Sequence, residues 1–576
     1  MLERSPTIST DSSDKAEMTA GAALFTRLKA LGVDYVFCNS GTDFPPIIEG
    51  LAEAAANDTD LPEAVVIPHE HAAVSMAHGY YFATGKAQAV ILHTNVGLAN
   101  GAIGAINAAT DQVPMILMSG RTPVMEKDRF GARTVPIGWG QEMRDQTSLV
   151  REASKWDYEL RFPEQVSEIL DRALAITNSH PKGPVYLSLP REVLCENVPA
   201  EGMGRPALMQ PNVGGPDAAS IELAARWLSE AQAPLIIGQR GAGSDAGFAA
   251  LSRLAGDWSI PVSQWWASAN MIASDHPSNV GWSLDPFISE ADVILVVNCL
   301  APWSPDVHKT RPDAKVIHLG PDPLFSRFPV RNFRSDLSIA CETGAGLVAL
   351  KDAMHERMHR HVGARMRRKE QLTERVTEIR AKADQEAAAS HPMTKAHVAR
   401  VLSDAIEGKG AQLVNELGCP LDYMTIREHQ AWRQEPHSGG LGWGLPCALG
   451  MQIADRSRLV VATMGDGSYM FANPVVCHQI MEALDLPVLV VVLNNSEWGA
   501  VRQSVVGLYP DGYAAKANRM PLTSLQPSPD FTKVAEGSGH YAVRVDQAED
   551  LAKAFADAIR HIEEKRKPAL VEVTIR

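Results

Sequence analysis

The fold of this chain is constrained most strongly by a threefold alternation of short apolar runs with amphipathic, helix-like segments. In the first block the apolar runs cover residues 33–38, 64–68, 89–94, 114–120 and 184–190. In the second they cover residues 233–239, 261–265, 292–298 and 314–320, and a third block begins near residue 391. All-apolar strands separated by helices are typical of parallel sheets covered on both faces. The sequence therefore predicts an α/β protein with three doubly wound parallel-sheet domains.

The chain is too long for one hydrophobic core, since 576 residues correspond to about three ordinary domains. A Pro- and Gly-rich stretch at residues 196–217 separates the first two blocks. Residues 351–390 are dense in charge, and the glutamates among the basic residues favour a solvated linker helix over a nucleic-acid-binding segment. We therefore expect an N-terminal domain at 1–200, a middle domain at 215–350, a linker helix at 351–390 and a C-terminal domain at 391–576.

Charge and composition exclude several classes of partner. The net charge of −14 argues against non-specific binding to nucleic acid or to an anionic membrane surface. The longest apolar runs, such as residues 486–493, are too short to span a bilayer. The seven cysteines form no CxxC pair, and the N-terminal residues 1–15 are polar. This pattern favours reduced thiols and a cytoplasmic location.

Two polar clusters follow neighbouring strands in the third block. One apolar run ends in Gly465, Asp466, Gly467 and Ser468, and the next, at 487–495, ends in two asparagines. Ligands of open α/β sheets gather outside the carboxyl ends of strands. A carboxylate and an amide oxygen, completed by a backbone carbonyl and phosphate oxygens, suit Mg²⁺ or Ca²⁺. The helix expected after Ser468 would offer its amide end to the phosphate. A plain turn is the alternative, but the two clusters together favour a metal-bound diphosphate.

The GDGS and NN signals together resemble the thiamine diphosphate (ThDP) motif of the decarboxylase and acetohydroxyacid synthase superfamily, and the likeness runs from about Met18 to Arg576. The resemblance implies a pyrimidine-binding (PYR) first domain, a Rossmann-like middle domain and a diphosphate-binding (PP) third domain. It also implies a Mg²⁺ site formed by side chains and one main-chain carbonyl, namely Asp466, Asn495 and the carbonyl of Glu497. Gly465, Gly467, Ser468 and Trp498 would lie beside the cofactor.

The segment 437–450, HSGGLGWGLPCALG, resembles the part of these proteins that holds the cofactor in its bent conformation. On that pattern the carbonyl of Gly439 would accept a hydrogen bond from the 4′-amino group. Leu441 would be the apolar wedge beneath the two rings. A glycine-rich helix start is the alternative interpretation of the same residues.

The segment 66–86, VIPHEHAAVSMAHGYYFATGK, resembles the glutamate segment of the superfamily. Glu70 would share a proton with N1′ of the aminopyrimidine and so promote removal of the thiazolium C2 proton. A glutamate at a helix start can also be only a favourable partner for the helix dipole. In the superfamily this glutamate serves a cofactor held by another subunit, which implies at least a homodimer and leads us to expect a tetramer.

Further candidates could manage protons or bind substrate. His93, at a predicted strand end, lies in a stretch that resembles benzoylformate decarboxylase, which implies an acid/base role. Glu497 could donate a proton, as in the pattern of 2-hydroxyacyl-CoA lyases, or could form an ion pair with Arg502. Weaker candidates for binding substrate are Thr42, with Asp43 beside it, Asn95 and Arg240.

The middle domain could bind a nucleotide. Residues 235–247 contain a strand followed by a glycine turn, and Arg240 could meet a phosphate there. The spacing of the glycines, however, is not that of the dinucleotide-binding fingerprint. Acetohydroxyacid synthases that bind FAD carry an Arg-Phe-Asp-Asp-Arg-like segment where this chain has CLAPWSPDVHK, which argues against FAD. An ADP unit, free or as part of coenzyme A, remains open.

These signals predict a ThDP- and Mg²⁺-dependent, non-oxidative C–C lyase or carboligase. The substrate favoured by Glu497 is a 2-hydroxyacyl-CoA, cleaved reversibly to formyl-CoA and an aldehyde or ketone. The alternatives are a benzoylformate-type 2-oxo acid decarboxylase, favoured by His93, and an acetolactate synthase-like carboligase. A catalytically silent structural or regulatory subunit is a hypothesis of another class, and the presence of Glu70, Asp466 and Asn495 argues against it.

Overall fold

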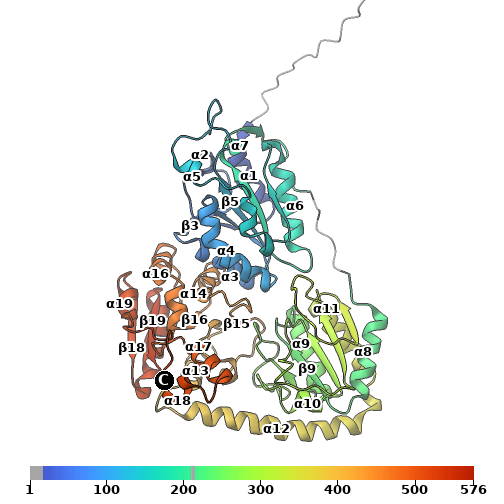
Figure 1. Ribbon diagram of the computed structural model, residues 1–576. Helices are drawn as coiled ribbons and strands as arrows, with labels where there is room; N and C mark the ends of the chain where they lie inside the picture. The colour runs from blue at the N-terminus through green and yellow to red at the C-terminus, as the bar shows by residue number, and fades with distance from the viewer. Residues whose placement is uncertain (1–16, 208, 210–213, 576) are drawn as a thin grey trace, which may run out of the picture.

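The computed structural model describes residues 17–207, 209 and 214–575, so the polar N-terminal residues 1–15 lie outside the described part. Three large parallel sheets form three α/β domains, as the apolar runs predict (Figure 1). In the view of Figure 1 the first domain lies above the other two, which lie side by side. The predicted class, three doubly wound parallel-sheet domains, is confirmed.

The first domain is built on a six-stranded parallel sheet. Its strands, in order across the sheet, are β3 (Glu63–Val66), β2 (Tyr35–Cys38), β4 (Gln88–Leu92), β5 (Met115–Arg121), β7 (Val185–Pro190) and β6 (Asp157–Glu159). Its helices are α1 (Ala20–Ala30), α2 (Pro45–Ala56), α3 (Glu70–Thr84), α4 (Thr94–Thr110), α5 (Ile137–Gly140), α6 (Val166–Asn178) and α7 (Arg191–Leu194). A short antiparallel pair, β1 (Glu17–Thr19) with β8 (Asn197–Pro199), joins the two ends of the domain.

The middle domain has a five-stranded parallel sheet. Its order is β10 (Val262–Ser263), β9 (Pro234–Gly238), β11 (Val293–Val297), β12 (Lys315–Gly320) and β13 (Leu337–Ala340). Its helices are α8 (Ala218–Glu230), α9 (Asp245–Trp258), α10 (Phe287–Glu290) and α11 (Thr343–His355). Every residue of β9 and β11 is buried, because helices and loops cover both faces of the sheet.

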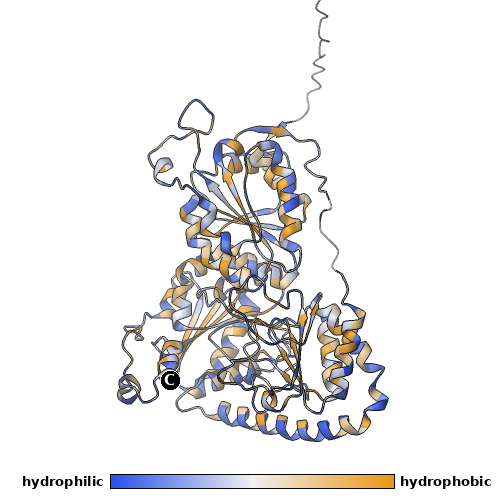
Figure 2. Cartoon of the chain, turned by 45° about the vertical axis from the view of Figure 1, so that its right-hand side comes forward, coloured by the Kyte–Doolittle hydropathy of each residue, from blue (hydrophilic) through white to orange (hydrophobic). Residues whose placement is uncertain are grey.

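A 27-residue helix, α12 (Val362–Ala388), connects the middle domain to the third (Figure 1). Most of its side chains are exposed, and Figure 2 colours much of it as hydrophilic. α12 lies within the stretch 351–390, where a linker helix was expected, whereas the residues of that stretch up to His355 belong to α11.

The third domain has a second six-stranded parallel sheet. Its order is β15 (Trp432–Gln434), β14 (Gln412–Glu416), β16 (Val460–Gly465), β17 (Leu489–Asn494), β19 (Ala569–Thr574) and β18 (Tyr541–Val545). Its helices are α13 (Lys395–Ile406), α14 (Gly444–Ala454), α15 (Asp466–Phe471), α16 (Pro474–Ala483), α17 (Gly499–Leu508), α18 (Tyr513–Ala517), α19 (Phe531–Glu536) and α20 (Ala548–Lys565).

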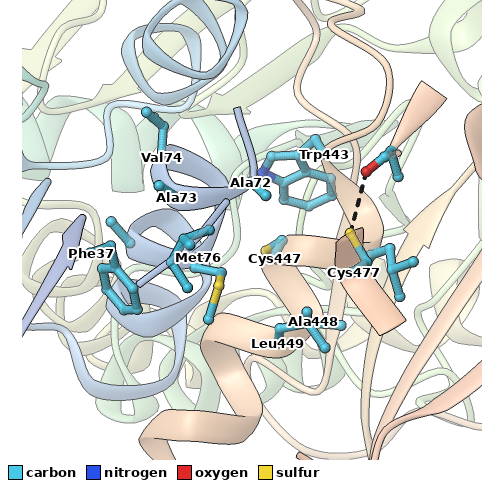
Figure 3. Packing of buried hydrophobic residues seen from close by; sticks show 14 of the residues in the cluster. Phe37, Ala72, Ala73, Val74, Met76, Trp443, Cys447, Ala448, Leu449 and Cys477 are labelled. Atoms are coloured by element: carbon cyan, nitrogen blue, oxygen red, sulfur yellow. Dashed lines mark hydrogen bonds between the residues drawn. The ribbon is translucent and has the colours of Figure 1, made fainter. Parts of the chain in front are cut away.

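The first and third domains share a hydrophobic core, in which α3 packs against α14 (Figure 3). Two glycines allow the helix backbones to touch. A Cβ on Gly79 would lie 1.9 Å from the carbonyl oxygen of Cys447, and a Cβ on Gly450 would lie 2.0 Å from that of Met76. Any side chain at either position would separate the helices, so this contact fixes how the two domains face each other.

All seven cysteines are free thiols, and six of them are buried. No helix in the described residues combines the length and apolar character needed to cross a bilayer.

Candidate functional site

The acidic turn and the paired asparagines meet at the carboxyl ends of β16 and β17, which are neighbours in the sheet. Oδ1 of Asp466 accepts the backbone N–H of Gly467 at 2.9 Å, and the same carboxylate is hydrogen-bonded to the backbone N–H of Ser496. Oδ2 of Asp466 is buried and has no hydrogen-bond partner among the described residues. The side-chain oxygen of Asn495 accepts the N–H of Glu497 at 3.2 Å.

This donor set fits a divalent cation. A buried carboxylate oxygen without a partner is costly unless a ligand completes it. Burial raises the pKa of Asp466, a shift that a bound cation would reverse. The described residues contain no group of three or more His, Cys, Asp or Glu that could hold a metal. The other ligands of such a cation are therefore expected to be amide, backbone, phosphate and water oxygens, the set that Mg²⁺ accepts.

The helix expected after Ser468 is α16, but a short helix that was not predicted, α15, precedes it. α15 begins at Asp466 itself, and Asn473, in a left-handed conformation, separates it from α16. The N-terminal amides at the turn therefore belong to the acidic motif. Trp498 lies against Gly467, because a Cβ on that glycine would meet its indole ring.

The predicted ring-holding segment lies between the first and third domains. Gly439 is exposed and has a φ of +68°, a conformation that favours glycine. The next residue, Gly440, accepts a hydrogen bond at its carbonyl oxygen from the Asn107 side chain of α4 at 2.9 Å. Leu441 is half-buried. The segment is thus held against the first domain of the same chain, while the residue expected to accept from the cofactor stays accessible.

Glu70 is the first residue of α3 and lies at the carboxyl end of β3. Its carboxylate accepts hydrogen bonds from the side-chain amides of Asn39, at 2.9 Å, and Asn100, at 2.5 Å. Both amides come from loops or helices that follow neighbouring strands. The carboxylate is therefore oriented by its own domain and remains partly exposed.

His93 follows β4 directly and forms a pair with Asp43, which lies in the loop after β2. Nδ1 of His93 lies 2.5 Å from Oδ1 of Asp43. This hydrogen bond is the main cause that raises the pKa of His93 above 6.5. The other ring nitrogen lies 3.2 Å from the side-chain amide of Gln141. The imidazole is thus oriented at both nitrogens and is partly exposed.

Two glycines leave the space that this pair occupies. A Cβ on Gly41 would lie 2.1 Å from Nδ1 of His93, and a Cβ on Gly120 would lie 1.6 Å from Oδ2 of Asp43. Next to the pair, Thr94 has a φ of +41°, which a β-branched residue rarely adopts. Strained backbone of this kind concentrates at functional sites.

Glu497 forms the ion pair that was one of the two alternatives for its side chain. Oε2 accepts from Nε of Arg502 at 2.6 Å, and the Thr523 hydroxyl donates to Oε1. The Arg502 hydrogen bond is the main cause that lowers the pKa of Glu497. The side chain is therefore held as a carboxylate, which does not support a proton-donor role. Its main-chain carbonyl stays a predicted metal ligand.

The weaker candidates are dispersed. Thr42 is exposed next to Asp43, and Asn95 lies in the first turn of α4 with a buried side-chain oxygen that has no partner among the described residues. Arg240 lies apart from them, where the middle domain meets the first, and donates to the carbonyl of Thr110 at 2.7 Å. The structure thus does not bring Arg240 together with His93 and Glu70.

Sequence reasoning missed three residues that orient the site: Asn39, Gln141 and Glu416. Asn39 directly follows a predicted strand, so the rule that ligands gather at strand ends could have found it. Glu416 also ends a strand, but its two backbone hydrogen-bonding partners lie just before α14 and at its first residue, later in the chain. Gln141 lies in an irregular segment with no sequence signal.

The structure therefore presents two sets of residues: an acidic turn, whose oxygen donors fit a divalent cation, beside a glycine-rich segment in the third domain, and an oriented carboxylate with an imidazole in the first. On a three-domain α/β fold, this arrangement is the one expected of an enzyme that uses a diphosphate-bearing cofactor.

Comparisons with known proteins identify that cofactor. Three family models match: "Thiamine pyrophosphate enzyme, N-terminal TPP binding domain" over residues 18–149, the "central domain" over 221–350, and the "C-terminal TPP binding domain" over 417–573. The chain therefore belongs to the thiamine pyrophosphate (ThDP) enzyme family, in the decarboxylase and acetohydroxyacid synthase superfamily, and is a ThDP-dependent enzyme.

Individual relatives are distant but match over nearly their full length. A probable acetolactate synthase large subunit of Methanocaldococcus jannaschii is 25% identical, over 97% of this chain and 92% of the relative. A probable 2-ketoarginine decarboxylase of Pseudomonas aeruginosa is 26% identical, over 94% and 91%. The solved structure of a ThDP-dependent 4-hydroxybenzoylformate decarboxylase of Rhodococcus jostii superposes with a TM-score of 0.77 at 22% identity, over 97% and 99%.

Proposed function

We propose that this protein is a non-oxidative, ThDP- and Mg²⁺-dependent 2-oxo acid decarboxylase. The observation that carries the proposal is the His93–Asp43 pair at the same strand-end edge as Glu70. When bound, ThDP supplies a carbon nucleophile and an electron sink for the electron pair released on loss of CO₂. What the protein must add is orientation and proton management.

The three side chains divide these tasks. Glu70 shares a proton with N1′ of the aminopyrimidine, and Asn39 and Asn100 keep its carboxylate in place. His93 would donate a proton to the substrate after the loss of CO₂, because the hydrogen bond to Asp43 raises its pKa and so favours the protonated imidazole. Asp43 holds the imidazole through Nδ1, so that Nε2 is the nitrogen that faces the substrate side, beside Gln141.

Asp466, Asn495 and the main-chain carbonyl of Glu497 would hold Mg²⁺ against the diphosphate. Gly465, Gly467, Ser468 and Trp498 would line the diphosphate site, with Gly439 and Leu441 against the rings. The free Oδ2 of Asp466 supports this assignment. Removing the metal with a chelator is expected to release ThDP, which dialysis followed by calorimetry would measure.

The first expected substrate, a 2-hydroxyacyl-CoA, rested on Glu497 as a proton donor. The ion pair with Arg502 removes that support, so we place CoA-ester cleavage behind decarboxylation. Carboligation is the other alternative, since bound ThDP could also supply the chemistry for joining the remaining carbon unit to a second carbonyl compound. A relative named acetolactate synthase is consistent with it.

A single experiment separates these activities. The protein is incubated with ThDP, Mg²⁺ and a panel of aryl and alkyl 2-oxo acids or 2-hydroxyacyl-CoA esters, and products are identified by mass spectrometry. We expect CO₂ and an aldehyde from a 2-oxo acid. Formyl-CoA from a CoA ester, without CO₂ release from any 2-oxo acid, would overturn the proposal, and so would ligated products alone.

We also propose that the active unit is a homodimer at minimum, with each Glu70 serving the third domain of the partner. Within the described residues, Glu70 forms its side-chain hydrogen bonds with its own domain. Apolar side chains are exposed beside both halves of the site: Val96, Ile103 and Ile106 on α4, and Phe471 and Val475 on α15 and α16. Apolar groups clustered in this way are expected to be covered by a second copy. Light scattering would measure the mass and would distinguish dimer from tetramer.

The middle domain has a cavity that favours a nucleotide as an additional ligand. A space of about 390 Å³ lies at the carboxyl ends of its strands, where the three domains meet. Nε and Nη1 of Arg240 and Nε of Arg433 are buried there without a hydrogen bond among the described residues, and the nearby carboxylate of Asp111 offsets part of their charge. Two such arginines suit a phosphate-bearing group such as ADP, free or within coenzyme A. Calorimetry with ADP and with CoA, on wild type and Arg240→Met, tests this: only a site built on Arg240 loses binding in the variant.

A further inference from the structure

Glu416 ends strand β14 and is almost completely buried, with 1% of its surface exposed. Its two carboxylate oxygens accept backbone N–H groups from both sides of Trp443. Oε1 accepts from Gly442 at 2.6 Å, and Oε2 accepts from Gly444 at 2.5 Å. These N–H groups belong to the end of the ring-holding segment and the start of α14, whose N-cap residue, Trp443, provides no side-chain cap.

The same carboxylate faces the side chain of Ser468, which partly offsets the rise that burial causes in the pKa of Glu416, and Glu416 pairs with Met464 of β16 directly before the acidic turn. One buried group therefore contacts both segments that are assigned to the cofactor. These two segments are not adjacent in the chain, because the rest of α14 and strand β16 lie between residue 450 and the acidic turn. Glu416 thus forms a direct bridge between the ring-holding segment and the acidic turn.

The residue after Glu416 is held in a strained conformation. Leu417 has a φ of +59°, which residues other than glycine rarely adopt. The ammonium group of Lys395 donates a hydrogen bond to the carbonyl oxygen of Leu417. The backbone N–H of Leu417 donates to Oε2 of Glu435 at 3.3 Å. Glu435 is buried, and Lys395 is half-buried. A strained residue persists only where its surroundings determine it, so the position of Glu416 is fixed from the other side too.

We propose that Glu416 is a positioning residue, which sets the spacing between the ring-holding segment at Gly439–Leu441 and the diphosphate turn at Ser468. Both ends of ThDP must be bound at once, so a fixed spacing between the two segments raises affinity without any contact to the reacting atoms. The inference rests on the assignment of the cofactor site and not on the identity of the substrate.

The test compares ThDP with inorganic pyrophosphate, which needs only the turn. In Glu416→Gln the amide can accept one N–H but not the second. We expect the Kd of ThDP, measured by calorimetry with Mg²⁺, to rise about tenfold or more, since hydrogen bonds to charged groups are the strong ones. The Kd of pyrophosphate is expected to stay within about threefold or to fall, because the substitution removes a carboxyl group that can carry a negative charge near the anion.

A matched control is available in the middle domain. Asp292 also accepts two backbone N–H groups, from Gln232 at 2.7 Å and Ala233 at 2.9 Å. Asp292→Asn removes the same kind of interaction at a distance from the cofactor segments, and it should leave both dissociation constants unchanged. If Glu416→Gln does not fold, Glu416→Asp is measured instead, because its shorter side chain cannot reach both N–H groups.

The outcomes are distinct. An equal loss of ThDP and pyrophosphate affinity, or no loss of either, overturns the positioning role. Failure of the wild-type protein to bind ThDP would overturn the cofactor assignment itself. Failure to release CO₂ from 2-oxo acids while ThDP still binds would refute only the proposed reaction.

Discussion

Asp43 and His93 are 50 residues apart in the chain, yet Oδ1 of the aspartate lies 2.5 Å from Nδ1 of the histidine. The two residues follow β2 and β4, which are adjacent in the sheet. The pair therefore depends on strand order, and it determines which nitrogen of the imidazole is available for chemistry.

The pair predicts a specific pH dependence. If His93 acts as a general acid, the rate should fall as pH rises through its pKa, which the hydrogen bond to Asp43 raises. Asp43→Asn removes that effect, so the falling limb of the kcat profile should move to lower pH. Steady-state kinetics across the neutral pH range measure this. If the falling limb of the kcat profile stays at the same pH in Asp43→Asn, a group other than His93 is being titrated.

Gly41→Ala should remove the function of His93 without changing the histidine itself. The new Cβ would lie 2.1 Å from Nδ1, so the ring must move. We expect kcat to fall by about 100-fold or more, the usual cost of losing a general acid, while the Kd of ThDP is maintained. Gly204→Ala is the control, because a Cβ there would meet nothing within 4 Å. Equal kinetics in the two variants would contradict the assignment.

Glu497→Gln should have a small effect. Its ion pair with Arg502 is partly exposed, and such pairs contribute about 0.2–1 kcal/mol to stability. We expect Arg502→Met to lower the melting temperature to a similar extent, and both variants to keep kcat within about threefold. A large loss of rate in Glu497→Gln alone, with metal content unchanged, would restore the proton-donor hypothesis.

Mixed dimers test whether the site is shared between subunits. Glu70→Gln and Asp466→Ala should each be nearly inactive, the first through loss of proton sharing and the second through loss of metal-dependent ThDP binding. If each site uses one residue from each chain, co-expression yields hybrid dimers with one intact site. Random pairing then restores roughly a quarter of wild-type activity. No recovery in purified hybrids would place both residues in a site within one chain.

Stability of the cofactor-free protein should fall as pH rises towards the neutral range, in part because of Glu435. Burial raises its pKa to about 7 from an ordinary value of 4.5. Between these values the folded protein holds a proton that the unfolded chain has released, so stability is lost as pH rises from about 4.5 to about 7. Glu435→Gln should flatten this decline in calorimetric melting temperature, whereas the exposed Glu564→Gln should not. An identical slope in all three proteins would disprove the contribution.

The sequence was most informative where chemistry follows a regular pattern. Apolar runs located β16 and β17, and the strand-end rule then brought Asp466 and Asn495 together. The short edge strands β6 (Asp157–Glu159) and β13 (Leu337–Ala340) were missed, because neither is a continuous apolar run. Edge strands are covered on fewer sides, so their sequences are less constrained.

The remaining details depend on side-chain directions and on packing between domains. Whether Glu497 is a free acid or forms an ion pair depends on the rotamer of its side chain. Residue types alone do not determine that rotamer. Arg240 contacts Thr110 of another domain, and no local pattern encodes that contact. The bridge through Glu416 likewise requires the three-dimensional positions of two separate segments.

The backbone contact between α3 and α14 has a consequence for how the protein is made. One partner of this buried pair is complete at Thr84, whereas the other begins only at Gly444. At ~5–20 residues per second, the ribosome needs on the order of tens of seconds to synthesise the intervening chain. During that time the apolar face of α3 that packs against α14 is exposed. We therefore expect the nascent chain to need chaperones until α14 has been synthesised.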